Sequence, residues 1–136
     1  MTQNIDLGKY TEFVDGVTSK TSTDVETFIA RIRELDAAGC DVPRLMTAGV
    51  GLASEGGEFN EIVKKIAFHG KEYSADNIFH MKRELGDIIW YWTNACKALG
   101  LDPNEVISEN VTKLEARYPG GKFSVWHSEN RQDGDL

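Results

Sequence analysis

Hydrophobic residues recur at intervals of three and four positions along most of this chain. That spacing places them on one face of an α-helix, with polar residues on the opposite face. No stretch alternates apolar and polar residues in the way that a strand does. We therefore predict an all-α protein, a bundle of four to five helices. With their caps, the helices are expected over residues 7–16, 23–38, 41–69, 74–99 and 102–117.

Several helix ends carry recognisable capping sequences. Thr23-Asp24-Val25-Glu26 has the form of a capping box, in which Thr23 and Glu26 satisfy free backbone N–H groups. Ser74 can cap the fourth helix, and Gly70 and Gly100 follow the third and fourth as C-caps. Pro119-Gly120-Gly121 ends the fifth helix, and we expect a short extended stretch over residues 122–126.

Length and composition narrow the class of protein. A chain of 136 residues suits one core, and we expect a single domain over residues 1–124 with a flexible tail at 125–136. The net charge of −7 argues against a nucleic-acid polymer as partner. The absence of a long apolar run or a signal-peptide pattern argues against a membrane. Two cysteines without close spacing fit a cytoplasmic location.

Two acidic pairs of the same form lie on the two most hydrophobic helices. Glu55 and Glu58 are three residues apart, as are Glu84 and Asp87, so each pair presents two carboxylates on one helix face. The 25 residues between Glu58 and Glu84 suffice to end one helix, turn and return antiparallel. Four carboxylates that converge repel one another unless cations lie among them. Hard divalent ions such as Mg²⁺ favour these oxygen ligands.

The alternative for either pair alone is a solvated helix face with surface ion pairs, which is common. Glu55, however, interrupts an apolar stripe that includes Leu52, Phe59 and Ile62. A carboxylate on an apolar face is costly unless something pairs with it. The two pairs taken together therefore favour a metal site.

The spacing of the two pairs resembles the signature of the MazG-like nucleoside triphosphate pyrophosphohydrolases, part of the all-α NTP pyrophosphatase superfamily. The flanking runs 52–54 and 84–91 agree with it, and the run 110–123 is similar to the ending of many short members. The resemblance covers about residues 40–124 and is to the short single-domain form of phages and bacteria. Gly56 and Gly57 depart from it, because many members carry larger residues at these positions.

This resemblance implies hydrolysis of a (d)NTP between the α and β phosphates, which yields (d)NMP and pyrophosphate. It implies two or more Mg²⁺ ions, or Mn²⁺, with Glu55, Glu58, Glu84 and Asp87 as metal ligands. We assign Glu55 as the catalytic base, because burial should raise its basicity. Related proteins form dimers or dimers of dimers, so we expect a homo-oligomer, with a tetramer favoured over a dimer.

The end of the fifth helix offers candidates for binding the phosphates. Lys113 and Arg117 are four residues apart and share a face, with Asn110 one turn before and Lys122 following. The family ending favours a phosphate role. The alternative is that cations are simply favourable at a helix C-terminus.

Three further features bear on packing and on the site. Gly56 and Gly57 are merely tolerated, permit a close helix contact, or leave room for a nucleotide. Tyr91 either braces a carboxylate or the substrate, or packs in the core or at an interface. Trp90 lies on neither main stripe and suggests a subunit interface.

The substrate base is not readable from these residues. Resemblance to phage members favours dGTP and GTP. One alternative is a dUTP or other nucleotide pyrophosphatase of the same superfamily. The other is a non-catalytic helical module that binds a nucleotide or a partner.

Overall fold

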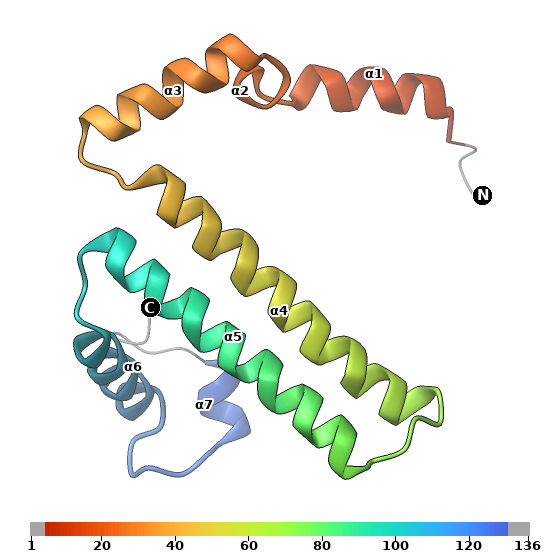
Figure 1. The fold of residues 1–136 in the computed structure, drawn as a ribbon, viewed down its shortest axis with the longest axis vertical. Helices are drawn as coiled ribbons and strands as arrows, with labels where there is room; N and C mark the ends of the chain where they lie inside the picture. The colour runs from red at the N-terminus through yellow and green to blue at the C-terminus, as the bar shows by residue number, and fades with distance from the viewer. Residues whose placement is uncertain (1–4, 131–136) are drawn as a thin grey trace. The chain divides into compact units, whose positions relative to one another are not determined.

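The computed structural model describes residues 5–130, and this part of the chain is helical without any strand (Figure 1). The prediction of an all-α protein is confirmed. Its helices in chain order are α1 (Leu7–Val17), α2 (Lys20–Thr23), α3 (Val25–Ala37), α4 (Val42–Phe68), α5 (Ala75–Leu99), α6 (Pro103–Arg117) and α7 (Val125–Glu129).

The chain divides into two compact units, Met1–Val42 and Pro43–Leu136. The first unit holds α1 to α3, and the second holds α4 to α7. Both acidic pairs lie in the second unit. The expectation of a single domain over residues 1–124 stays a prediction.

In the first unit, the cap of α3 differs from the predicted one. Asp24 is the N-cap, and its carboxylate accepts hydrogen bonds from the backbone N–H of Thr27 at 2.8 Å and from the Thr27 hydroxyl at 2.5 Å. Thr23 instead ends α2, a short helix that lies between the first two predicted helices, and its hydroxyl donates back to the carbonyls of Ser19 and Lys20 at 3.3 Å. The predicted Thr23 cap was wrong, because that hydroxyl is engaged in the preceding turn.

In the second unit, α4 and α5 form an antiparallel hairpin with the boundaries that the capping residues predict (Figure 1). Gly70 follows α4 with φ of 68°, and Gly100 ends α5 with φ of 66°, both in the left-handed region that glycine favours. The hydroxyl of Ser74 accepts the N–H of Asn77 at 3.3 Å at the start of α5. Near the open end of the hairpin, Arg44 donates to the side-chain oxygen of Asn94 at 3.1 Å.

Few apolar side chains of the described residues are fully buried, namely Val42, Ala48 and Cys96. Ile78, Leu85 and Ile89 share an exposed apolar face of α5, and Phe79 and Trp90 are exposed beside it. Contiguous exposed apolar faces often mark an interaction surface. Among the described helices, none combines the length and the apolar character needed to cross a membrane.

The segment after α6 is more helical than expected. Gly120 and Gly121 both have positive φ, of 89° and 69°, which explains why α6 ends just before them. Residues 125–129, expected within an extended stretch and a flexible tail, form α7, whose Ser124 cap accepts the N–H of His127 at 3.4 Å. Residues 131–136 of the expected tail lie outside the described residues.

Candidate metal centre

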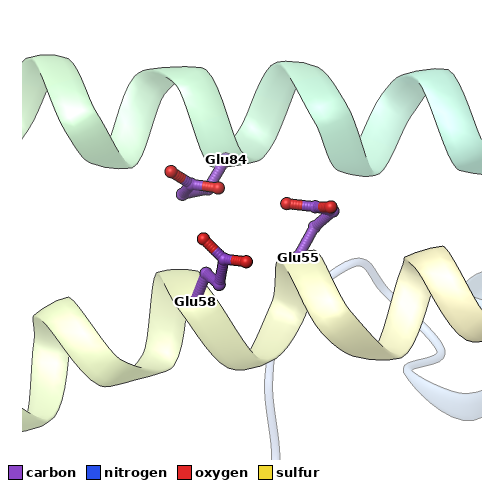
Figure 2. A group of neighbouring side chains, drawn as sticks. All are labelled: Glu55, Glu58 and Glu84. Carbon is purple, nitrogen blue, oxygen red and sulfur yellow. The ribbon is translucent and has the colours of Figure 1, made fainter.

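Three of the four predicted carboxylates converge between α4 and α5. Glu55 and Glu58 extend from α4 and Glu84 from α5, into the space between the two helices (Figure 2). One carboxylate oxygen from each lies within 4.8 Å of the others. We call Glu55, Glu58 and Glu84 the carboxylate cluster. Glu58 is exposed, whereas Glu55 and Glu84 are half-buried, so the cluster is open to solvent on one side.

Asp87 is close to this cluster but is not part of it. It lies one turn after Glu84 on α5 and is exposed. Its charge nevertheless acts on Glu55 across the hairpin. The structure therefore brings the two acidic pairs opposite each other as predicted, with Asp87 at the edge. The role of each residue as a metal ligand stays a prediction.

Within the cluster, the pKa of Glu55 is shifted by its surroundings. Partial burial is the largest cause of a raised pKa at this carboxyl group, because it disfavours the charged form. The negative charges of Glu58, Asp87 and Glu84 raise the pKa further. The unfavourable energy of the charged Glu55 carboxylate falls when the group takes up a proton or when a cation binds nearby.

A contact one turn away holds the two helices at this separation. The ring of Tyr91 lies directly against Gly51 of α4, so that a Cβ atom at Gly51 would be only 2.2 Å from two ring carbons. Gly51 precedes Glu55 by four residues, and Tyr91 follows Asp87 by four. The Tyr91 ring is also packed edge-to-face with Trp90, with ring centroids 4.8 Å apart. Tyr91 thus packs between the two helices, and a bracing role towards a carboxylate or the substrate stays a prediction. Gly51 was not singled out in the sequence.

The adjacent glycines Gly56 and Gly57 behave differently from Gly51. No atom of a neighbouring described segment lies within 4 Å of a Cβ placed at either position. Neither glycine therefore serves a close helix contact within the described chain. Two interpretations stay open, that the glycines are merely tolerated and that they leave room for a nucleotide.

A hollow of about 290 Å³ continues from the cluster towards the α4–α5 turn. We call it the hairpin hollow; it is lined by Glu58, Glu61, Ile62, Lys71, Asn77, His80 and Glu84. Glu61 is not in the cluster, because it forms ion pairs with Lys64 and, at 3.2 Å, with Lys65. These two ammonium groups, Lys64 first, hold the pKa of Glu61 below its ordinary value.

The predicted phosphate-binding residues lie elsewhere in the second unit. Asn110, Lys113 and Arg117 are on α6, and Lys122 follows it. None of the four lines the hairpin hollow. Lys122 lines a separate and largely apolar hollow of about 250 Å³ with Leu114, Tyr118 and Phe123, among others. Their role in binding phosphate stays a prediction.

A family model described as the MazG nucleotide pyrophosphohydrolase domain matches residues 46–121, more than half of the chain. The chain belongs to the MazG family. The matched MazG region contains the carboxylate cluster, Asp87 and the hairpin hollow. It leaves out the whole of the first unit and Lys122. Membership supports a nucleotide pyrophosphohydrolase activity in general terms, and it confirms the resemblance seen in the sequence.

One curated relative of this MazG protein is the "Gene 37 protein" of Mycobacterium phage L5. It is 32% identical over 88 residues, which is 62% of this chain and 76% of the relative. No solved structure matches the chain.

The donor set of the cluster fits the divalent cations on which MazG enzymes depend. All three groups are carboxylates, with neither cysteine nor histidine among them. Oxygen-only donors select hard ions such as Mg²⁺ and Mn²⁺ over Zn²⁺ or copper. Burial first, and then the neighbouring carboxylates, raise the pKa of Glu55, and a bound cation would offset the repulsion among these carboxylates.

Proposed function

We propose that this protein hydrolyses a nucleoside triphosphate between its α and β phosphates and releases a nucleoside monophosphate and pyrophosphate. The observation that carries the proposal is the convergence of Glu55, Glu58 and Glu84 within a MazG domain. These three residues, with Asp87 beside them, would hold two or more Mg²⁺ or Mn²⁺ ions. Such ions neutralise the triphosphate, lower the pKa of water and stabilise the charge that develops.

The residues of the chain then have distinct tasks. Glu58 and Glu84 would bind the metal ions and fix their position, because the carboxylate oxygens of the two residues face each other across the hairpin (Figure 2). Glu55 is the proposed base. Its carboxylate takes a proton from the attacking water, whose oxygen forms a bond to the α phosphorus while the bond to the β-phosphate oxygen breaks. The raised pKa of Glu55 suits this task, since a more basic carboxylate accepts a proton more readily.

We further propose that the working form is a homo-oligomer, a tetramer in preference to a dimer. The exposed apolar face of α5 supports this, because Leu85, Ile89 and Trp90 each have half or more of their surface exposed. A second copy would remove such a face from water, which favours association. It could also bring Asn110, Lys113, Arg117 and Lys122, none of which lines the hairpin hollow within the described chain, towards the site. Light scattering coupled to size-exclusion chromatography tests this, and a monomer at assay concentration would refute it.

The substrate base rests on resemblance to phage members, which favours dGTP and GTP. Product analysis tests the reaction and the base together. Each common ribonucleoside and deoxyribonucleoside triphosphate is incubated with Mg²⁺ and the full chain, and the products are separated by ion-exchange chromatography. We expect monophosphate and pyrophosphate from guanine nucleotides. A preference for dUTP would support the proposed reaction and contradict the proposed guanine nucleobase.

Two variants make the assay specific. Glu55→Gln keeps the size of the side chain and removes the base, so turnover should fall on the order of 100-fold or more. Glu105→Gln alters an exposed carboxylate in the first turn of α6 and should leave turnover unchanged. Diphosphate and phosphate as products would refute the mechanism. Absence of turnover with every triphosphate, under Mn²⁺ as well, would favour a non-catalytic nucleotide-binding module.

A further inference from the structure

The hairpin hollow extends from the carboxylate cluster towards the turn that joins α4 to α5. Glu58 and Glu84 belong to both, so the two spaces are continuous. On α5, His80 and Asn77 precede Glu84 by four and seven residues and therefore share its helix face. A molecule bound at the cluster can thus extend along this face into the hollow.

The chemistry of the lining excludes a nucleobase as the natural occupant. The lining includes no aromatic ring other than the His80 imidazole, and Ile62 is its only apolar side chain. Bases are usually held by stacking on aromatic faces and by apolar contact. Lys71, Asn77 and His80 instead offer N–H groups, which suit phosphate oxygens.

Lys71 is the residue of the hollow whose ammonium group can bind an anion. Of the lysines around the turn, Lys64 and Lys65 are paired with Glu61, whereas Lys71 takes part in no ion pair within the described chain. Three lysines face five carboxylates in this region, those of Glu55, Glu58, Glu61, Glu84 and Asp87. Two divalent cations held by the cluster would therefore leave the region with net positive charge, as the binding of a polyanion requires.

Hydrogen bonds connect the backbone of Lys71 and the following residue to both helices. Its N–H donates to the carbonyl of Lys65 at the end of α4, at 3.1 Å. The side chain of Asn77 on α5 donates to the carbonyl of Glu72, the next residue, at 2.6 Å. Asn77 is itself tied to the Ser74 cap. These bonds position the root of the Lys71 side chain at the edge of the hollow, and such preorganisation reduces the entropy lost on binding.

We propose that the hairpin hollow binds the pyrophosphate end of the triphosphate. Lys71 and His80 contact the β and γ phosphates, and Asn77 acts as a positioning residue for the loop of Lys71. The site rests on the proposed function, because pyrophosphate is then the group that leaves. Charge builds up on that group as the bond to the α phosphate breaks, so a positive charge held there stabilises the transition state.

Calorimetric titration of the full chain with pyrophosphate in the presence of Mg²⁺ tests this site directly. Lys71→Met should weaken pyrophosphate binding about tenfold or more, the effect of losing one charge-assisted contact. His80→Ala should weaken it as well. Lys82→Met is the matched control, because Lys82 is exposed on α5 and does not line the hollow. Binding of Mg²⁺ alone, and of guanosine monophosphate with Mg²⁺, should be unchanged in all variants.

The outcomes separate this site from the proposed reaction. Unchanged pyrophosphate affinity in Lys71→Met, equal loss in Lys82→Met, or equal loss for the monophosphate would overturn the site, whether or not the protein turns over triphosphates. Failure of the unmodified protein to bind pyrophosphate would overturn it too. Selective loss in Lys71→Met, in a protein that cleaves no triphosphate, would support the site and refute the reaction.

Discussion

The contact between Gly51 and Tyr91 makes a sharp prediction about the metal centre. A Cβ atom at Gly51 would lie 2.2, 2.2 and 2.4 Å from three carbons of the Tyr91 ring. Carbon atoms in contact normally lie about 3.5–4.0 Å apart, so Gly51→Ala requires a displacement of about 1.3 Å or more. Either the ring must leave its place against α4, or α4 and α5 must separate one turn away from Glu55.

The magnitude follows from comparison with a second glycine on the same helix. Overpacking of this kind costs about 1–3 kcal/mol. Alanine is also favoured over glycine within a helix, by roughly 0.5–1 kcal/mol. Gly49 lies on the same helix with nothing within 4 Å of its Cβ position. Gly49→Ala should therefore gain the helix preference of alanine without any steric cost. The difference between the two variants therefore isolates the clash, and Gly51→Ala should be about 1–3 kcal/mol less stable than Gly49→Ala.

Urea unfolding followed by circular dichroism, with EDTA and at one protein concentration, measures this difference. The Mg²⁺-induced rise in melting temperature should also be smaller for Gly51→Ala, because displaced helices hold Glu55 and Glu84 farther apart. Tyr91→Ala combined with Gly51→Ala completes a double-mutant cycle, in which the coupling energy should match the clash. Equal stability and equal Mg²⁺ response of the two alanine variants would refute the reasoning.

Two further predictions concern ionisation. The raised pKa of Glu55 means that the folded, metal-free protein binds its proton more tightly than the unfolded chain does, so this group lowers stability as pH rises above the ordinary glutamate pKa. In thermal melts with EDTA at neutral pH, Glu55→Gln should melt higher than the unmodified protein but gain less from Mg²⁺; a lower melting temperature would contradict this. The lowered pKa of Asp24, caused first by the Thr27 hydroxyl and then by its N–H, adds stability that is present above the ordinary aspartate pKa and lost as pH falls through the lowered value. Asp24→Ala should therefore lower the melting temperature of the first unit at neutral pH, with a difference that shrinks in acid, and a pH-independent difference would count against the cap.

The helices of the second unit could be predicted closely because their ends are set by local chemistry. Ser74 and Asp102 accept backbone N–H groups within a few residues, and Gly70 and Gly100 adopt a conformation that few other residues tolerate. The cap of α3 was missed for a related reason. Thr23 and Asp24 are both good caps, and the choice between them depended on the short helix α2, which local sequence did not indicate.

The candidate site was predictable in part. The spacing of three residues places Glu55 beside Glu58 on any helix, and a hairpin of this length brings Glu84 opposite them. The same argument treats Asp87 as equal to Glu84, yet Asp87 lies outside the cluster, because helix rotation and side-chain length decide which oxygens meet. His80 and Lys71 were not predicted to lie beside the site, although His80 shares the helix face of Glu84.

The sequence alone therefore determined the five longer helices, most of their caps and the facing acidic pairs, because these depend on interactions within a few residues or on the periodicity of one helix. Tertiary structure decided the separation of α4 and α5, through the Tyr91 ring against Gly51. It also decided which carboxylates converge, and that a polar hollow with Lys71 adjoins them. Such features depend on atoms that meet across a turn, and their positions follow from packing rather than from spacing along the chain.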